Sequence, residues 1–229
     1  MSRLRFALLD ASRGSEMTRR NFRRELDADL AEFHAREGEL PRNFDFDGVV
    51  VTGSGASVYW DEDWIAALNE YLADAHERGI PILGVCYGHQ ALATALGGRV
   101  EAMDDYEIGY RTVEHSGGDL FRDVDDEFLV FTTHGDTVVE LPTGAELLAE
   151  NEYGVHAFRV GDAFGVQFHP EYDAYTAASV TKGKDFSEQR IQSVLDGITA
   201  ENYETACEAK ALFDNFVAHA RQVRDERAA

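Results

Sequence analysis

The first hundred residues alternate between continuous apolar runs and segments in which apolar residues recur every three or four positions. Continuous runs are typical of strands buried on both faces of a parallel sheet, and the three- to four-residue spacing is typical of helices. The predicted strands are 4–10, 46–55 and 80–86, and the predicted helices are 18–37, 61–79 and 89–98. This alternation predicts an α/β fold: an open, mostly parallel, doubly wound sheet with helices on both faces.

The helix predicted at 18–37 depends on four regularly spaced apolar residues. Phe22, Leu26, Leu30 and Phe33 lie four, four and three positions apart, as on one face of an amphipathic helix. We therefore expect a single helix across this segment.

Residues 99–170 have a different pattern, with short strand-like pieces separated by turns. The sequence "RVGDAFGV" predicts a hairpin across Gly161–Asp162. A small antiparallel region is therefore expected beside the parallel sheet. Residues 174–186 are predicted to form a loop, and the chain from about Ser187 is predicted to be helical. We expect one domain over residues 1–229, with a helical C-terminal extension at about 187–229.

The composition is strongly acidic and limits the partners to be expected. The 229 residues include 43 acidic and 21 basic ones, which gives a net charge of −22. Such a charge repels nucleic-acid backbones and acidic membranes, so neither is expected as a partner. The carboxylates are spread along the chain, which favours adaptation to high salt over an acidic segment that binds a basic partner.

Neither the N-terminal segment nor the cysteines indicate export. No apolar run approaches the roughly 20 residues of a membrane span, and Asp10 interrupts the short run near the start. Cys86 and Cys207 are the only two cysteines, so a disulfide framework is not expected. We predict a cytoplasmic protein in which Cys207, within a helical pattern, is a core residue.

Cys86 lies in the most informative motif of the chain, "PILGVCYGHQ". An apolar strand that leads into G-x-C-x-G and then a helix is the thiol counterpart of a nucleophile elbow, in which Gly84 and Gly88 permit a tight turn. The N-terminus of the following helix would favour a thiolate at this position. The alternative is a buried cysteine whose flanking glycines serve only packing.

A nucleophilic thiol needs a base, and "QFHPE" supplies the best candidate. His169 directly follows an apolar strand, and Pro170 stiffens the chain beyond it. The carboxylate of Glu171 is close enough in sequence to turn back and orient the imidazole. The two motifs together predict a nucleophile, a base and an orienting group.

These two motifs, with three further segments, resemble the class I glutamine amidotransferase family. The segments are "VVVTGSGASVYWDEDW", similar to a glycine-rich strand that often reads S-G-G-P-x-S-V-Y; "IGYRTVEH"; and "THGDTVVELPTG", similar to an H-x-D-x-V-x-x-L-P-x-G loop. The resemblance covers about residues 46–172, in order and with the family's spacing. It implies the glutaminase fold of this family and a glutamine-cleaving activity.

The resemblance also implies roles for individual residues. Cys86 would attack the side-chain amide of glutamine, His169 would transfer protons, and Glu171 would orient His169. The oxyanion would be held by the backbone N–H groups of Tyr87 and of one residue in the Gly53–Ser54–Gly55 loop. Ser54 and Gly55 stand where the family usually has glycine and proline, which leaves the second donor open.

The same resemblance assigns a substrate pocket. Gln90 would help to form it, and the loop near His134 and Asp136 would close it, although Asp136 also fits a simple turn residue. His89 is expected to be structural.

Signals for a cofactor are weak in this sequence. "TGSGAS" lacks the third glycine of a dinucleotide-binding motif, because position 58 is valine. Cys86 and His89, His134 and Asp136, and His169 and Glu171 have spacings found in zinc sites, but a base-activated thiol would be wasted as a ligand. We expect no metal and no cofactor.

Three functions remain open at the sequence level. The chain contains no P-loop and no S-G-G-x-D-S pyrophosphatase motif, so a synthetase that uses the ammonia would be a separate subunit. The first hypothesis is a glutaminase similar to the amidotransferase domain of GMP synthase. The second is a hydrolase of γ-glutamyl peptides or related γ-glutamyl compounds. The third, a non-catalytic regulatory protein, is disfavoured by the intact cysteine, histidine and glutamate.

Overall fold

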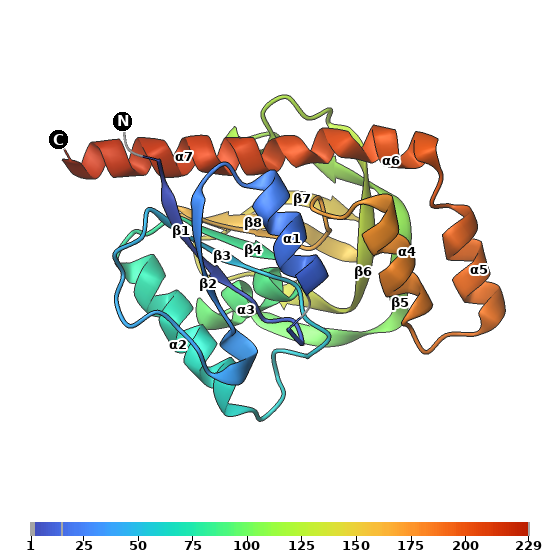
Figure 1. The fold of residues 1–229 in the computed structure, drawn as a ribbon, viewed down its shortest axis with the longest axis horizontal. Coiled ribbons are helices and arrows are strands. Elements are labelled where there is room, and N and C mark those ends of the chain that lie inside the picture. Colours follow the sequence, from blue (N-terminus) through green and yellow to red (C-terminus); the bar gives the residue numbers. More distant parts are fainter. Residues whose placement is uncertain (1–2, 15, 229) are drawn as a thin grey trace.

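The computed structural model describes residues 3–14 and 16–228, whose strands form one mixed sheet (Figure 1). The strands are β1 (Arg5–Leu9), β2 (Asp29–Phe33), β3 (Gly48–Val51), β4 (Ile82–Val85), β5 (Arg99–His115), β6 (Glu127–Glu140), β7 (Glu146–Asn151), β8 (Gly154–Val160) and β9 (Ala163–Val166). The α-helices are α1 (Glu16–Glu25), α2 (Asp63–Glu77), α3 (Tyr87–Ala95), α4 (Ala174–Lys182), α5 (Glu188–Asp196), α6 (Ala200–Ala206) and α7 (Ala211–Ala228). Short 3-10 helices are η1 (Ala35–Glu37), η2 (Asp119–Phe121) and η3 (Cys207–Lys210).

The sheet has a parallel part and an antiparallel part that meet at β9. The strand order is β2-β1-β3-β4-β9-β8-β7-β5-β6, and the pairings from β2 to β9 are parallel. The order of this parallel part is that of flavodoxin-like sheets. The pairings from β9 to β6 are antiparallel and include the predicted hairpin across Gly161–Asp162. The predicted α/β class is confirmed, with an antiparallel part that is larger than expected.

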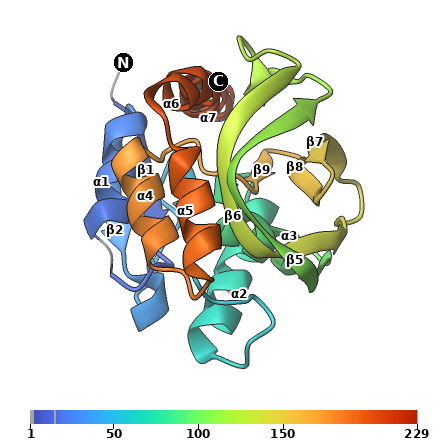
Figure 2. The ribbon, with the colours of Figure 1, turned by 90° about the vertical axis from the view of Figure 1, so that its right-hand side faces the viewer.

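The antiparallel part is extended by the long ribbon of β5 and β6. β5 spans 17 residues and pairs with β6 over most of its length, curving across one side of the molecule (Figure 2). Its first half, with the sequence "RVEAMDDYE", is mostly polar and carries no alternating pattern, so the sequence indicated only the second half.

Apolar layers cover both faces of the parallel part, as the apolar runs predicted. Along β1, Phe6 and Leu8 pack with α1 and α7, whereas Ala7 and Leu9 on the opposite face pack with α2 and α3. The rings of Phe6 and Phe216 lie 5.6 Å apart, which places α7 directly on the sheet. The last helix of the predicted helical tail, α7, is therefore part of the main hydrophobic core.

The helix predicted at 18–37 is wrong in its second half. α1 ends at Glu25, and the chain turns into β2, which pairs in parallel with β1 at the sheet edge. Leu30 packs with the core on one face of the sheet and Phe33 with the core on the other. Residues three apart lie on opposite faces of a strand but on the same face of a helix, so both patterns fit until the edge of the sheet is known.

The loop predicted at 174–186 is also wrong, because residues 174–182 form α4. Asp173 caps this helix by accepting a hydrogen bond from the N–H of Thr176 at 2.7 Å, and Ala177 is fully buried. The sequence "AYTAASVTK" mixes alanines with β-branched residues of low helix propensity, so its propensity is ambiguous and the cap and the tertiary contacts decide its structure. Among the described helices, none is both long enough and apolar enough to cross a membrane.

The packing of α3 on the sheet depends on two glycines. A methyl group on Gly84 would lie 2.3 Å from the carbonyl oxygen of Gly88, and one on Gly88 would lie 2.5 Å from the carbonyl oxygen of Val51. The backbones of β3, β4 and α3 thus approach one another more closely than any side chain allows. This is why glycine stands on both sides of Cys86.

Gly84→Ala is expected to lower the free energy of unfolding by about 1–3 kcal/mol, because a backbone must move to admit the methyl group. Gly55→Ala is the matched control, since nothing lies within 4 Å of a methyl group placed there. Denaturant unfolding of both variants measures the effect. Equal stability of the two variants would contradict this account of the elbow.

Candidate active site

Cys86 forms the turn between β4 and α3 in a rare backbone conformation. Its φ of 54° and ψ of −104° lie outside the regions that non-glycine residues normally occupy. The turn is held by the N–H of Cys86, which donates to the carbonyl of Val166 on β9 at 2.8 Å. The sulfur lies at the carboxyl end of β4, where ligands bind in open parallel sheets.

His169 and Glu171 follow β9, next to β4 in the sheet. The N–H of His169 donates to the carbonyl of Phe131 at 2.9 Å, and the ring stacks on Tyr172 with centroids 4.0 Å apart. Nδ1 of His169 lies 2.8 Å from Oε1 of Glu171, and both side chains are buried. The imidazole is therefore fixed in orientation by its own backbone, by a carboxylate and by a stacked ring.

Cys86 and His169 meet at the backbone of Gly53. A Cβ placed on Gly53 would lie 2.9 Å from Cε1 of His169 and 3.6 Å from Cβ of Cys86. Any side chain at this position would displace the imidazole. The structure thus brings together the three residues predicted as nucleophile, base and orienting group, with the predicted glycine loop beside them.

The environment of His169 favours its protonated form. Burial lowers the pKa of His169, but the charge of Glu171 and hydrogen bonds to Glu171 and Cys86 outweigh burial and raise it to about 10. The imidazole therefore carries a proton at neutral pH.

α1 holds the segment that carries Glu171. Arg24 donates to the backbone carbonyl of Glu171 at 2.6 Å, and both Arg20 and Arg24 pair with Asp173 at 3.0 and 3.1 Å. The sheet alone does not fix this segment, because β9 ends at Val166.

A pocket of about 310 Å³ opens beside Cys86. The predicted residues that line it are Ser54, Gly55, Cys86, Gln90, His134 and Asp136. Tyr87 contributes no side chain to this lining, because its ring is buried against Trp64 with centroids 5.5 Å apart. Its backbone N–H, in the first turn of α3, has no partner within the helix.

Gln90, His134 and Asp136 are joined through one carbonyl oxygen. The backbone oxygen of Asp136 accepts hydrogen bonds from Nε2 of Gln90 at 3.0 Å and from Nδ1 of His134 at 2.9 Å. The carboxylate of Asp136 accepts from Ser57 at 2.6 Å and from Tyr59 at 2.8 Å. These contacts link α3, β6 and the loop after β3 around the pocket.

The model of the family described as glutamine amidotransferase class-I matches residues 12–183. The chain belongs to the class I glutamine amidotransferase family.

A curated relative, the glutamine-hydrolysing GMP synthase of Vibrio vulnificus, is 40% identical over 134 residues. That match covers 57% of this chain and 25% of the relative, so the chain spans about a quarter of the relative's length. Among solved structures, a glutamine amidotransferase from Thermotoga maritima has a TM-score of 0.78 at 25% identity and covers 95% of this chain and 99% of its own. A protein from Thermoplasma acidophilum that is proposed to belong to a GMP synthase has a TM-score of 0.73 at 21% identity over both full chains and shares the fold.

Glu107, His134 and His156 form a buried cluster next to the pocket, and this cluster could be considered as a metal site. Their potential ligand atoms lie within 4.8 Å of one another. However, Oε2 of Glu107 and Nε2 of His134 are only 2.5 Å apart, a hydrogen-bond distance that is shorter than the separation of two ligands around a tetrahedral ion. Asn151 donates to the other carboxylate oxygen at 2.8 Å. The cluster orients His134, which faces the pocket.

His89, which we expected to be structural, is buried against Phe158 with ring centroids 5.0 Å apart. Burial lowers the pKa of His89 to about 3, so its ring is neutral. Reasoning from the sequence missed four polar side chains that line the pocket: Ser57, Tyr106, Thr133 and Lys184. Ser57 lies within the quoted S-V-Y segment, so it offered a signal, whereas no motif contains Lys184.

Glu107→Gln is expected to destabilise the fold in a pH-dependent way. Burial raises the pKa of Glu107, but His134 and His156 outweigh burial and lower it from 4.5 to about 2. The contribution of a carboxylate with a lowered pKa is complete above about pH 4.5 and is lost as the pH falls through about 2. The substitution should cost roughly 3 kcal/mol of unfolding free energy at pH 7.

Denaturant titrations of the native chain and of Glu107→Gln between pH 7 and pH 3 measure this difference, which should narrow below about pH 4.5. Glu150→Gln, which changes an exposed carboxylate on β7, is the control. A difference independent of pH would show that Glu107 acts by packing and not by charge.

Proposed function

We propose that this chain is a glutaminase that hydrolyses the side-chain amide of glutamine through a thioester on Cys86 and releases ammonia. The observation that carries the proposal is the position of Cys86: a strained elbow beside the His169–Glu171 pair, at the wall of a pocket of about 310 Å³. Its class I glutamine amidotransferase family and the glutamine-hydrolysing activity named for its relatives support the same reaction.

The proposed reaction has two steps. The sulfur of Cys86 attacks the amide carbon of glutamine, and the carbon–nitrogen bond breaks as His169 gives a proton to the departing ammonia. A water molecule then attacks the γ-glutamyl thioester and gives a proton to His169, and the carbon–sulfur bond breaks. Glutamate leaves, and the sulfur of Cys86 and the protonated imidazole of His169 return to their starting state. Glu171 keeps the imidazole in one orientation throughout both steps.

Backbone N–H groups stabilise the tetrahedral intermediate in this proposal. Tyr87 supplies one, at the N-terminus of α3, and the Gly53–Gly55 loop supplies the other. Gly53 lies against the imidazole, whereas Ser54 and Gly55 face the pocket. Ser54 is also held by Arg36, which donates to its hydroxyl at 3.3 Å, and this contact fixes the loop.

We propose a separate synthetase of the GMP synthase type as the consumer of the ammonia. The match covers 25% of the glutamine-hydrolysing GMP synthase, so the partner would supply the remaining chemistry. The alternative is a hydrolase of γ-glutamyl peptides. Tyr59 and Trp60 support this alternative function. Both side chains are exposed in the loop that borders the pocket, where they offer apolar surface to a substrate larger than glutamine.

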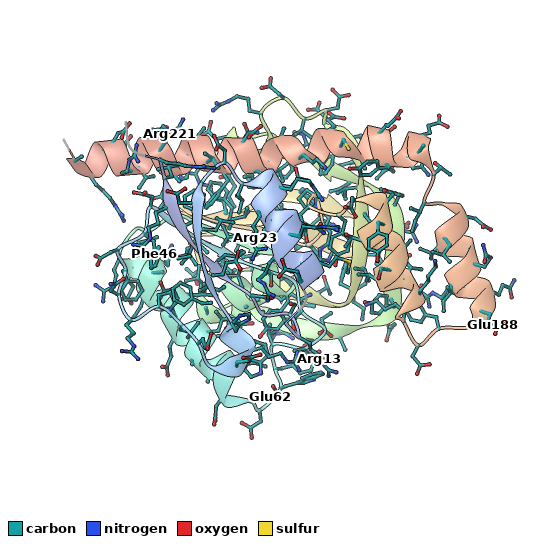
Figure 3. The ribbon with its side chains drawn as sticks, viewed as in Figure 1. Arg13, Arg23, Phe46, Glu62, Glu188 and Arg221 are labelled. Carbon is teal, nitrogen blue, oxygen red and sulfur yellow. The ribbon has the colours of Figure 1, made fainter. Side chains whose placement is uncertain are left out.

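We also propose that the protein works in the cytoplasm at high salt. The net charge is −22, and charged side chains such as Glu188 and Arg221 project from the outer edges of the molecule (Figure 3). Concentrated salt screens the repulsion among so many carboxylates, which favours the compact state.

Cys86→Ala is expected to reduce glutamine hydrolysis roughly 10⁴-fold or more, because no other group can form the thioester. Cys207→Ala is the matched control, since Cys207 lies in η3 and outside the pocket lining. Ammonia release in molar salt measures both variants. Undiminished activity of Cys86→Ala would refute the proposed chemistry.

Glutamine is expected to be cleaved with a higher kcat/KM than a γ-glutamyl dipeptide, and addition of a GMP synthase-type synthetase should raise its rate. Both substrates are to be compared in molar salt, with and without the synthetase. Faster cleavage of the dipeptide, with no response to a synthetase, would favour the alternative function.

A further inference from the structure

Lys184 lines the same pocket as Cys86, although it lies far from it in sequence. It stands in the short connection between α4 and α5, one residue beyond the segment that the family model matches. Figure 2 shows α4 and α5 side by side at one side of the molecule. The connection between α4 and α5, just before the helical C-terminal extension, therefore contributes a charged residue to the site.

The ammonium group of Lys184 has no carboxylate partner among the residues that the structure describes. Lys210, in contrast, pairs with Glu25 at 2.9 Å. Lys184 instead donates a hydrogen bond to the hydroxyl of Tyr106, and its nitrogen lies 4.7 Å from the centre of the Tyr106 ring. A half-buried cation without a counter-ion is unusual in a chain with 43 acidic residues.

Tyr106 and its neighbours fix the position of Lys184. The Tyr106 ring packs closely against Gly135, because a Cβ placed on Gly135 would lie 2.8 Å from Cδ2 of this ring. The hydroxyl of Tyr106 lies 3.1 Å from the hydroxyl of Thr133. Phe186 packs edge-on against the same ring at 5.1 Å, and Arg190 donates to the Tyr106 carbonyl at 2.5 Å. The pocket wall that carries Lys184 is therefore preorganised.

Asp136 supplies the opposite charge in the same pocket. Its carboxylate oxygens are held by Ser57 and Tyr59, so its charge is fixed as well. In the described lining of the pocket, Lys184 is the one lysine and Asp136 supplies the one carboxylate. One cation and one anion match the carboxylate and ammonium groups on the α-carbon of an amino acid.

We propose that Lys184 binds the α-carboxylate of the γ-glutamyl substrate, with Asp136 facing the α-ammonium group. This inference rests on the proposed function and adds a substrate class to it: glutamine, or a γ-glutamyl compound whose α-carboxylate is free. Glutamine residues within a peptide chain, whose α-carboxyl groups form amide bonds, are then excluded.

The test compares ligands that lack one charged group. Glutaramate is glutamine without the α-ammonium group, and 4-aminobutanamide is glutamine without the α-carboxylate. Equilibrium binding of all three is measured by calorimetry on the full chain carrying Cys86→Ala, so that no turnover occurs. Each ligand is tested on the chain with Lys184 unchanged, on Lys184→Met and on Lys184→Arg. The control is Lys182→Met, which changes an exposed lysine two residues away.

Lys184→Met should weaken binding of glutamine and glutaramate roughly 10- to 150-fold and leave 4-aminobutanamide unchanged. Lys184→Arg should restore most of the affinity, and Lys182→Met should have no effect. In the chain with Cys86 present, Lys184→Met should raise KM for glutamine far more than it lowers kcat.

Unchanged glutamine affinity in Lys184→Met, or an equal loss of affinity for 4-aminobutanamide, would overturn the proposed role of Lys184. If the native chain still hydrolyses glutamine, the proposed glutaminase function stands. If Lys184→Met weakens glutamine binding but the native chain does not hydrolyse glutamine, the role of Lys184 stands and the glutaminase function is overturned. Absence of glutamine binding to the chain with Lys184, together with absence of glutamine hydrolysis by the native chain, would overturn both proposals.

Discussion

The close approach of three backbones at the elbow is the constraint on which the site depends. Gly84, Gly88 and the carbonyl of Val51 leave no room for a side chain, and this contact seats α3 directly on β3 and β4. The turn between β4 and α3 is then too tight for ordinary dihedral angles, and Cys86 takes a φ of 54°. Because the strain is imposed by packing on both sides, the sulfur is held at the sheet edge before any substrate arrives.

The antiparallel part of the sheet positions the imidazole and the pocket wall, whereas the parallel part positions the nucleophile. β9 belongs to both parts: it pairs with β4, which leads into Cys86, and itself leads into His169. On β6, the carbonyl of Phe131 accepts a hydrogen bond from the N–H of His169. A few residues further along, the same strand forms the pocket wall. The nucleophile, the imidazole and the pocket are thus placed by neighbouring strands, and one rigid sheet fixes their relative positions.

Much of this arrangement follows from the sequence, because its strongest signals are local. The apolar runs predicted β1, β3 and β4, and the glycine-flanked cysteine and "QFHPE" predicted residues that the structure brings together. The errors came where tertiary contacts decide. Leu30 and Phe33 fit a helix or a strand equally well until β1 offers an edge to pair with, and residues 174–182 become helical through the Asp173 cap and burial of Ala177. Lys184 and Glu107 enter the site through contacts between segments remote in sequence, which no local pattern reveals.

The central claim is that Cys86 becomes covalently attached to the γ-glutamyl group while His169 serves the proton transfers. The most direct measurement is the mass of the chain after rapid acid quenching of a reaction with glutamine, followed by peptide mapping. The account predicts an added γ-glutamyl group on the peptide that contains Cys86, which accumulates during turnover and disappears when glutamine is exhausted. Turnover of glutamine with Cys86 unmodified throughout, or with the added mass on the peptide of Cys207, would contradict it.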